Sequence, residues 1–439
     1  MDASDAELAV EAACEAFKTW QDVTGEERGR LLRKWAKLVK ENAEALTQIL
    51  AGETRKLKNE AKLEEVGLVT SIDPLPGKKL LIEKQPLGVV VVISPWNFPP
   101  MLSSKKVATA LAAGSTCVVK PPEDAPLSTL SAVQLAQDAR IPKRVINVVT
   151  CDRSNASQIG KIFCESKLVA GISFTGSTAI GKILHQQCGP HIKRISLELG
   201  GTFPFLVSNS ANIDEAAQLG IQSKFFNCGQ VSIADIIPGE GLAPLINSTQ
   251  FKRVCGIVED AISKGANVIV EGQPAEDVGK LFYQPTCGIV EDAISKGANV
   301  IVGGQPAEDI GELFYQPTLI TEVTAEMQIY TEEIFGPVAS VIKFKTEEEG
   351  VAMANDTEKG LGSYFFSQDV SQIFRVSRLL QNGVVWVNEG IFLPNKAPFG
   401  GVKESGIGRE GSHHGIEDFT YIKFICMYWK FVKLMFLIK

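Results

Sequence analysis

Between residues 89 and 198, short apolar runs alternate with segments of helical periodicity, and this alternation limits the folds open to the chain. In chain order the apolar runs and the helical segments between them are Val89–Ser94, Ser103–Ala113, Thr116–Lys120, Leu127–Ala139, Val145–Val149, Ala156–Cys164 and a run ending at Phe174. Continuous apolar strands that alternate with helices are typical of a parallel sheet covered on both faces. The pattern therefore predicts an open α/β domain.

Length, charge and cysteine content narrow the class of protein. A chain of 439 residues can form more than one domain. Its net charge of −7, without a dense basic run, argues against a nucleic-acid surface. Nine scattered cysteines include no Cys-x-x-Cys pair, so we expect reduced thiols and no metal site. The start, Met1–Asp5, is acidic and lacks an arginine-rich leader, which predicts a cytoplasmic location for the chain as given.

A carboxylate stands at the end of an apolar run, in Glu198-Leu199-Gly200-Gly201, and Gly229-Gln230-Val231-Ser232 ends thirty-four residues after Glu198. An isolated carboxylate at the end of a buried strand would have its pKa raised by desolvation and would suit general base work. The alternative is a solvated carboxylate at a strand end.

Five further segments occur in a fixed order around this pair. They are Pro95–Pro99, Val119–Asp124, Phe174–Thr178, Glu332–Pro337 and Pro398–Gly406. Together these segments resemble the NAD(P)-dependent aldehyde dehydrogenase family. Within that family, Asn388–Gly390 and Gly408–Ser412 are similar to the succinate-semialdehyde type, which acts in GABA degradation. The resemblance implies an open Rossmann-type cofactor domain, an α/β catalytic domain and small oligomerisation strands. Because relatives of this type are mitochondrial in animals, a leader missing from the chain as given stays an alternative.

The resemblance also implies catalytic roles. In this family a cysteine thiolate attacks the aldehyde, and here Ser232 stands at that position. A serine hydroxyl ionises far less readily than a thiol, and no histidine motif lies beside it to act as a base. Cys228 comes four residues too early to replace it. Glu198 would activate water, and Asn97 would donate to the developing oxyanion, unless Asn97 only bonds the turn after its strand.

The implied cofactor is NAD. Lys120 and Glu123 would contact the adenine ribose, and the carboxylate would repel the 2′-phosphate of NADP. Gly176 and Ser177 open a helix whose free N–H groups would face the pyrophosphate. The nicotinamide end would lie among Trp96, Glu333 and Phe335, which completes the predicted cofactor-binding set.

Substrate selection departs from the resembling enzymes. Lys105 and Phe226 stand where those enzymes carry arginines, and no serine lies between Gly390 and Pro398. A carboxylate substrate favours a bidentate guanidinium, which a lysine replaces only as a point charge. The substrate is therefore predicted to be a small aldehyde, with weakened recognition of a carboxylate at its other end.

Four segments depart from the family pattern. The segment 59–79 is shorter than the corresponding segment of the family. Only ten residues separate Ser232 from Ala243, too few for the strand and helix that the family has there. Residues 255–286 and 287–318 match at all but three positions. We expect the second copy to be the native one and the first to have no place in the sheet. The tail from Phe424 is too lysine-interrupted to span a bilayer, although a membrane-surface helix stays an alternative.

These features predict three parts. Residues 1–74 and 87–198 would bind NAD, residues 199–402 would form an incomplete catalytic domain, and residues 75–86 and 411–439 would hold the oligomerisation strands and tail. Three functions stay open: a degenerate aldehyde dehydrogenase, a working enzyme whose odd segments are errors of gene prediction, and a non-catalytic NAD-binding protein. The last would join active paralogues through the oligomerisation strands, and both a homo-oligomer and a hetero-oligomer with paralogues stay open.

Overall fold

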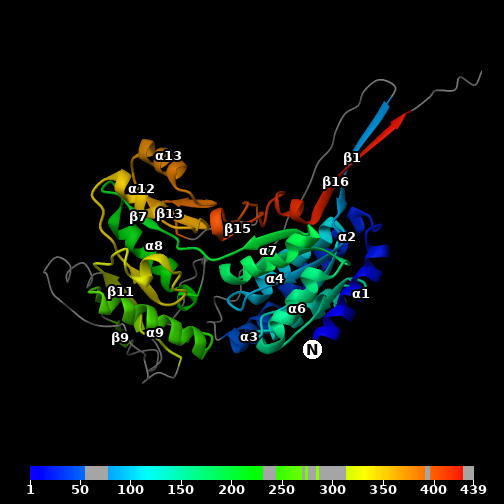
Figure 1. The fold of residues 1–439 in the computed structure, drawn as a ribbon, viewed down its shortest axis with the longest axis horizontal. Helices are drawn as coiled ribbons and strands as arrows, with labels where there is room; N and C mark the ends of the chain where they lie inside the picture. Colours follow the sequence, from blue (N-terminus) through cyan, green and yellow to red (C-terminus); the bar gives the residue numbers. More distant parts are fainter. Residues whose placement is uncertain are drawn as a thin grey trace, which may run out of the picture.

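The computed structural model describes residues 1–54, 78–230, 244–268, 272–274, 283–285, 313–390 and 396–428 (Figure 1). The helices are α1 (Ala3–Trp20), α2 (Gly25–Glu41), α3 (Ala43–Thr54), α4 (Pro99–Ala113), α5 (Leu127–Asp138), α6 (Arg153–Glu165), α7 (Thr178–Cys188), α8 (Ile213–Phe225), α9 (Ser248–Ser263), α11 (Gln328–Thr331), α12 (Glu347–Asn355) and α13 (Val370–Leu379), with 3₁₀ turns η2 (Gly189–His191), η3 (Phe226–Gly229), η4 (Lys403–Ser405) and η5 (Gly415–Phe419). The strands are β1 (Lys78–Pro86), β2 (Val89–Ile93), β3 (Thr116–Lys120), β4 (Ile146–Val148), β5 (Val169–Thr175), β6 (Arg194–Glu198), β7 (Phe205–Val207), β8 (Asn267–Val268), β9 (Gly272–Pro274), β10 (Tyr283–Pro285), β11 (Thr318–Thr321), β12 (Val338–Ser340), β13 (Gly362–Phe366), β14 (Val384–Val387), β15 (Gly406–Ile407) and β16 (Thr420–Tyr428).

The first half of the chain folds around a six-stranded sheet with the order β15-β6-β5-β2-β3-β4. All its strands are parallel except β15, which pairs antiparallel with β6. Every residue of β2 and β3 is buried, which explains why these strands are continuously apolar instead of alternating. The predicted open α/β fold is confirmed.

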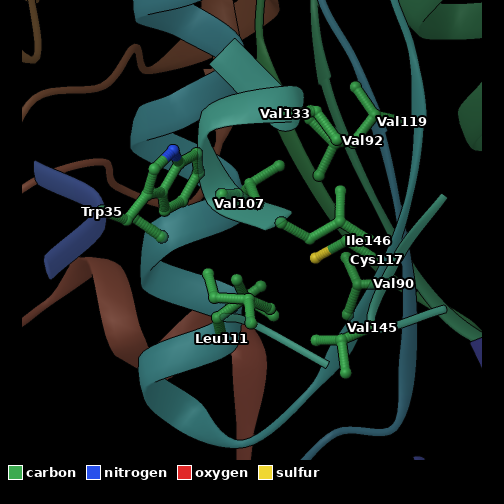
Figure 2. Packing of buried hydrophobic residues seen from close by; sticks show 14 of the residues in the cluster. Trp35, Val90, Val92, Val107, Leu111, Cys117, Val119, Val133, Val145 and Ile146 are labelled. Atoms are coloured by element: carbon green, nitrogen blue, oxygen red, sulfur yellow. The ribbon is translucent and has the colours of Figure 1, made fainter. Parts of the chain in front are cut away.

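Helices cover both faces of this sheet. On one face Val90 and Val92 of β2 pack in a cluster with Trp35 of α2 and with Val107 and Leu111 of α4 (Figure 2). The indole Nε1 of Trp35 donates to the carbonyl of Ala132 at 2.9 Å. On the other face the alternate residues of β2 pack against α1, α6 and α7. The side chains of β2 therefore pack against the helices on both faces of the sheet.

The second half holds two three-stranded sheets, with the orders β14-β13-β7 and β12-β11-β8 among the described residues. A separate antiparallel ribbon pairs β1 with β16 in nine residue pairs, from Lys78↔Tyr428 to Pro86↔Thr420. This ribbon projects away from the body (Figure 1). Ile422 and Phe424 on it are exposed. Within the described residues, no helix is long and apolar enough to cross a membrane.

The expectation that the first repeat copy has no place in the sheet was wrong. Its residues Ile257, Val258 and Ala261 are buried in the core through α9, which begins upstream of the repeat at Ser248. Val268, also of the first copy, pairs antiparallel with Ile320 of β11. Because the two copies are nearly identical, chain connectivity decides which one continues the helix. Most of the second copy, the short segment after residue 54, residues 231–243 and the end of the tail lie outside the described residues.

The repeat offers a matched pair of substitutions. Ile257→Ala should lower the free energy of unfolding by about 2–5 kcal/mol, because it opens a cavity in a packed core. Ile289→Ala, at the same place in the second copy, should have a much smaller effect. Urea unfolding followed by circular dichroism measures both. A larger loss from the second substitution would show that the second copy supplies the core helix.

Candidate active site

The site residues predicted from the sequence follow four neighbouring strands of the six-stranded sheet. Asn97 comes after β2, Lys120 ends β3, Gly176 comes after β5 and Glu198 ends β6. The carboxyl ends of parallel strands lie at the same edge of a sheet. Here β2 pairs with β3 on one side and with β5 on the other. Such a point, where the strand order reverses, is where open α/β sheets bind their ligands. The fold brings these four residues to one edge.

Glu198 is held at the end of β6 by backbone pairing on both sides. Its carbonyl accepts from the N–H of Gly176 at 3.0 Å, and Gly406 of β15 lies opposite it. The side chain is only 4% exposed, and Gly400 leaves the space that its Oε1 occupies. Among the described residues its Oε2 has no hydrogen-bond partner. Burial, and then the negative charge of Glu410, raise the pKa of Glu198 well above its usual range.

Glu410 and two lysines form a buried ionic cluster that the sequence analysis missed. Lys106 of α4 pairs with Oε1 of Glu410 and donates to Oγ of Ser173 at 3.2 Å. Lys105 lies 3.3 Å from Oε2 of the same carboxylate. Burial opposes ionisation of Glu410, but Lys106 and Lys105 outweigh it and lower the pKa of Glu410 to about 2. The one signal in the sequence is that Lys106 falls on the buried face of α4, in period with Ser103 and Ala110.

Asn97 lies in the turn between β2 and α4, where Pro99 and Pro100 start the helix without costing it a hydrogen bond. Its side chain is buried, and within the described part of the chain its Oδ1 has no hydrogen-bond partner. Its carbonyl accepts from Nδ2 of Asn227 at 3.4 Å. The turn that carries Asn97 therefore contacts the segment that leads toward Ser232.

That segment is tightly bent. Asn227, Cys228 and Gly229 all have positive φ, at 49°, 56° and 69°. A Cβ at Gly229 would collide with the carbonyl of Gly336, so only glycine fits there. Cys228 is buried and belongs to the same core cluster as Leu245 and Val254. Ser232 itself lies outside the described residues.

The predicted cofactor residues fall into two groups. Lys120 and Glu123 form an ion pair with each other just beyond β3. Ser177 caps α7, where its Oγ accepts from the N–H of Ile180 at 3.4 Å. The remaining N–H groups at the start of α7 are free of intrahelical partners, as at any helix start, and suit a phosphate. Gly176 precedes them.

The second group consists of Trp96, Glu333 and Phe335. The ring of Phe335 meets that of Trp96 edge to face, with centroids 5.5 Å apart. Glu333 approaches Gly200 so closely that a Cβ there would overlap its carboxylate. Burial raises the pKa of Glu333, against the opposing effect of the Gly201 N–H. Glu333 therefore lies against the turn that follows Glu198.

A further cation, missed by the sequence analysis, lies near Glu333. Burial lowers the pKa of Lys224, near the end of α8, to about 8, although the charge of Glu333 and the Cys228 thiol oppose the shift. Within the described residues, no group of three His, Cys, Asp or Glu side chains could hold a metal ion.

The predicted substrate residues are only partly visible. Lys105 forms an ion pair with Glu410, and the Nζ of Lys105 lies 5.5 Å from the centre of the Phe399 ring. The side chain of Phe226 and residues 391–395 lie outside what the structure describes. Lys105 is therefore poorly placed to offer a free positive charge.

The raised pKa of Glu198 makes a prediction about stability. The unfolded chain ionises this carboxyl near pH 4, whereas the folded chain keeps the proton to higher pH. The folded state then binds more protons, and its stability falls as the pH rises between these limits. Glu198→Gln should therefore be more stable than the parent by about 1–3 kcal/mol at pH 8, and equal to it near pH 4. Glu11→Gln, on an exposed turn of α1, is the control. Denaturant unfolding at both pH values measures the difference, and a loss of stability at pH 8 would contradict the assignment.

Comparison with known proteins agrees with the geometry. The family model described as "Aldehyde dehydrogenase family" matches residues 1–237 and 286–425 of this chain. The unmatched stretch contains the first repeat copy, although the structure builds α9 from it. The mitochondrial succinate-semialdehyde dehydrogenase of Homo sapiens is 41% identical over 96% of this chain and 81% of its own length. A 3-sulfolactaldehyde dehydrogenase of Pseudomonas putida is 40% identical over 97% of this chain and 90% of its own.

Solved structures give the same result. A succinate-semialdehyde dehydrogenase from Burkholderia pseudomallei superposes with a TM-score of 0.84 at 34% identity, covering 98% of this chain and 91% of that one. A betaine aldehyde dehydrogenase from Staphylococcus aureus in complex with NAD⁺ gives 0.83 at 29% identity, over 99% and 90% of the two chains. The chain belongs to the aldehyde dehydrogenase family.

Proposed function

We propose that this protein binds NAD and takes small aldehydes of the succinate-semialdehyde kind, with a weakened oxidation step. The observation that carries the proposal is the buried Glu198 carboxyl, unpartnered among the described residues and set on the same sheet edge as Asn97 and the start of α7. A buried carboxyl without a bond costs folding free energy, so its retention favours a chemical role.

Each residue has a distinct task in this proposal. Asn97 stabilises negative charge on the aldehyde oxygen, and Glu198 takes a proton from water once its own proton has left. Lys120 and Glu123 hold the adenine ribose, the start of α7 holds the pyrophosphate, and Glu333 holds the nicotinamide ribose. Bound NAD supplies the acceptor for a hydride. The succinate-semialdehyde relatives and the NAD⁺-bound betaine aldehyde dehydrogenase support these assignments.

The weak point is the nucleophile. Ser232 must lose its proton before it can attack, and its hydroxyl is far less acidic than a thiol. The chain also runs from Ser232 to Ala243 without room for a further strand and helix. The two three-stranded sheets share no strand among the described residues, which is consistent with an absent element between them. We infer slow chemistry rather than lost binding.

Substrate preference should also differ from that of the relatives. Two of the similar enzymes are named for succinate semialdehyde and 3-sulfolactaldehyde. Both of these aldehydes carry a negative charge. The Lys105 charge is already paired with Glu410 in this chain. We expect a smaller preference for anionic over neutral aldehydes.

A second function, as a partner of active paralogues, is favoured by one observation. The β1–β16 ribbon projects from the body and leaves both outer strand edges without a partner among the described residues. Such edges pair readily with another chain. An oligomer, with identical copies or with paralogues, would use this ribbon. Because the similar human enzyme is named as mitochondrial, such an oligomer could form there if a leader directs the chain.

Activity separates these functions. The chain should form NADH from succinate semialdehyde well below the ordinary turnover of about 1–10³ per second. Ser232→Cys should raise the rate but stay below that range, because about 1 Å of misplacement costs on the order of a hundredfold. Ser232→Ala is the control for any contribution of the hydroxyl. Ordinary turnover by the unchanged chain would overturn the claim of weakened oxidation.

Cofactor preference tests the site independently of catalysis. Calorimetric titration should show NAD binding about tenfold or more tighter than NADP, because Glu123 repels the 2′-phosphate. Glu123→Gln should reduce the preference for NAD over NADP, because it removes the repelling carboxylate and leaves Lys120 without its ion-pair partner. Glu7→Gln, exposed on α1, should leave it unchanged. Tighter binding of NADP by the parent chain would refute the assignment of Glu123.

A further inference from the structure

The ends of α6 and α7 bring two cysteines together on one face of the six-stranded sheet. Cys164 is the second-last residue of α6, and Cys188 is the last residue of α7. The two helices pack against each other, and both cysteines belong to one core cluster. The Sγ of Cys164 lies 3.9 Å from the carbonyl of Leu184. Leu184 and Cys188 share one face of α7, one turn apart, so the Cys164 thiol faces the final turn of that helix.

The two thiols interact with each other. The Cys164 thiol favours a thiolate at Cys188, which lowers the pKa of Cys188 and raises that of Cys164. Burial raises both pKa values, and the Lys193 ammonium lowers both, whereas Glu165 raises that of Cys164. Lys193 is fixed beside them by donating to the carbonyls of Ser166 and Val169. Cys188 is therefore the thiol better prepared to react as a thiolate.

Both thiols are buried, at 0% and 2% exposure, yet each lies one residue from the surface. Glu165 follows Cys164 and is exposed, and Gly189 follows Cys188 and is exposed as well. The last turn of a helix opens at a small free-energy cost, because its final carbonyls lack intrahelical partners. Local opening of these two helix ends would expose the thiols to a small oxidant while the sheet stays folded.

We propose that Cys164 and Cys188 form a reversible disulfide when the protein meets a hydroperoxide. The Cys188 thiolate attacks one peroxide oxygen, the O–O bond breaks, and Cys188 becomes a sulfenic acid, while the other oxygen takes a proton and leaves as water from hydrogen peroxide or as an alcohol from an organic hydroperoxide. The Cys164 sulfur then attacks the sulfenic sulfur and expels the second oxygen, which leaves as water with the Cys164 proton. The two thiols are oxidised by two electrons and the hydroperoxide is reduced. A thiol reductant reverses the reaction.

The bond would close a loop that contains the candidate pyrophosphate site. Residues 164–188 include all of β5, Gly176, Ser177 and α7. Tying the two helix ends restricts the unfolded chain and should raise the melting temperature. The inference needs neither NAD nor an aldehyde, and it stands apart from the proposed function.

Peptide mapping of the full chain tests the proposal. The folded protein is treated with hydrogen peroxide at low excess, free thiols are blocked, and peptides are separated without reduction. We expect a linked peptide pair that contains Cys164 and Cys188, lighter than the two free peptides by two hydrogen atoms, and lost on treatment with dithiothreitol. Oxidation should also raise the melting temperature.

Two variants make the test specific. Cys188→Ser should abolish the linked peptides and the shift in melting temperature. Cys117→Ser, which removes a fully buried thiol from β3, should change neither. The proposal is overturned if both thiols are alkylated after peroxide treatment, if each is oxidised separately to a sulfinic acid, or if the link forms only under denaturing conditions.

Discussion

The parallel register of β2 with its two neighbours is the constraint on which the candidate site depends. Ile93 of β2 lies opposite Lys120 of β3 and Phe174 of β5, so the three strands end at the same level. Their following turns then meet at one edge, although they come from segments far apart in the chain. The buried valines of β2 fix this register because a slip of one residue would exchange the side chains that face the two helix layers.

Electrostatics at this edge oppose stability. Among the described residues Glu198 forms no ion pair, while Glu410, its like-charged neighbour, pairs with the buried Lys106 and a second lysine. Pairing these lysines with Glu410 lets that carboxylate ionise, and its charge helps to raise the pKa of the buried Glu198. A chain selected for stability alone would replace Glu198 with an apolar or amide side chain. Its presence fits the general observation that active sites lower stability in exchange for function.

Local patterns predicted the sheet. Continuous apolar runs identified β2, β3 and β5, whereas the candidate site residues that follow these strands were assigned from the family resemblance. The pair between Lys106 and Glu410 could not be predicted in this way, since the partners lie 304 positions apart in the chain and no local pattern links them. The pKa values at the site depend on that pair. Fold was therefore accessible from periodicity, whereas the charge state of the site required tertiary contacts.

The tandem repeat shows a different limit of sequence reasoning. Two nearly identical segments have the same helical propensity and the same apolar pattern, so neither property can decide which segment enters the core. The decision depends on connectivity. Residues 248–254 start α9 and lead directly into the first copy, while Tyr315 and Thr318 of the second copy lead directly into β11. The core is thus built from the front of one copy and the end of the other. In each case the copy used is the one joined to the neighbouring element by the shorter stretch of chain. The shorter connection has the smaller cost in loop-closure entropy.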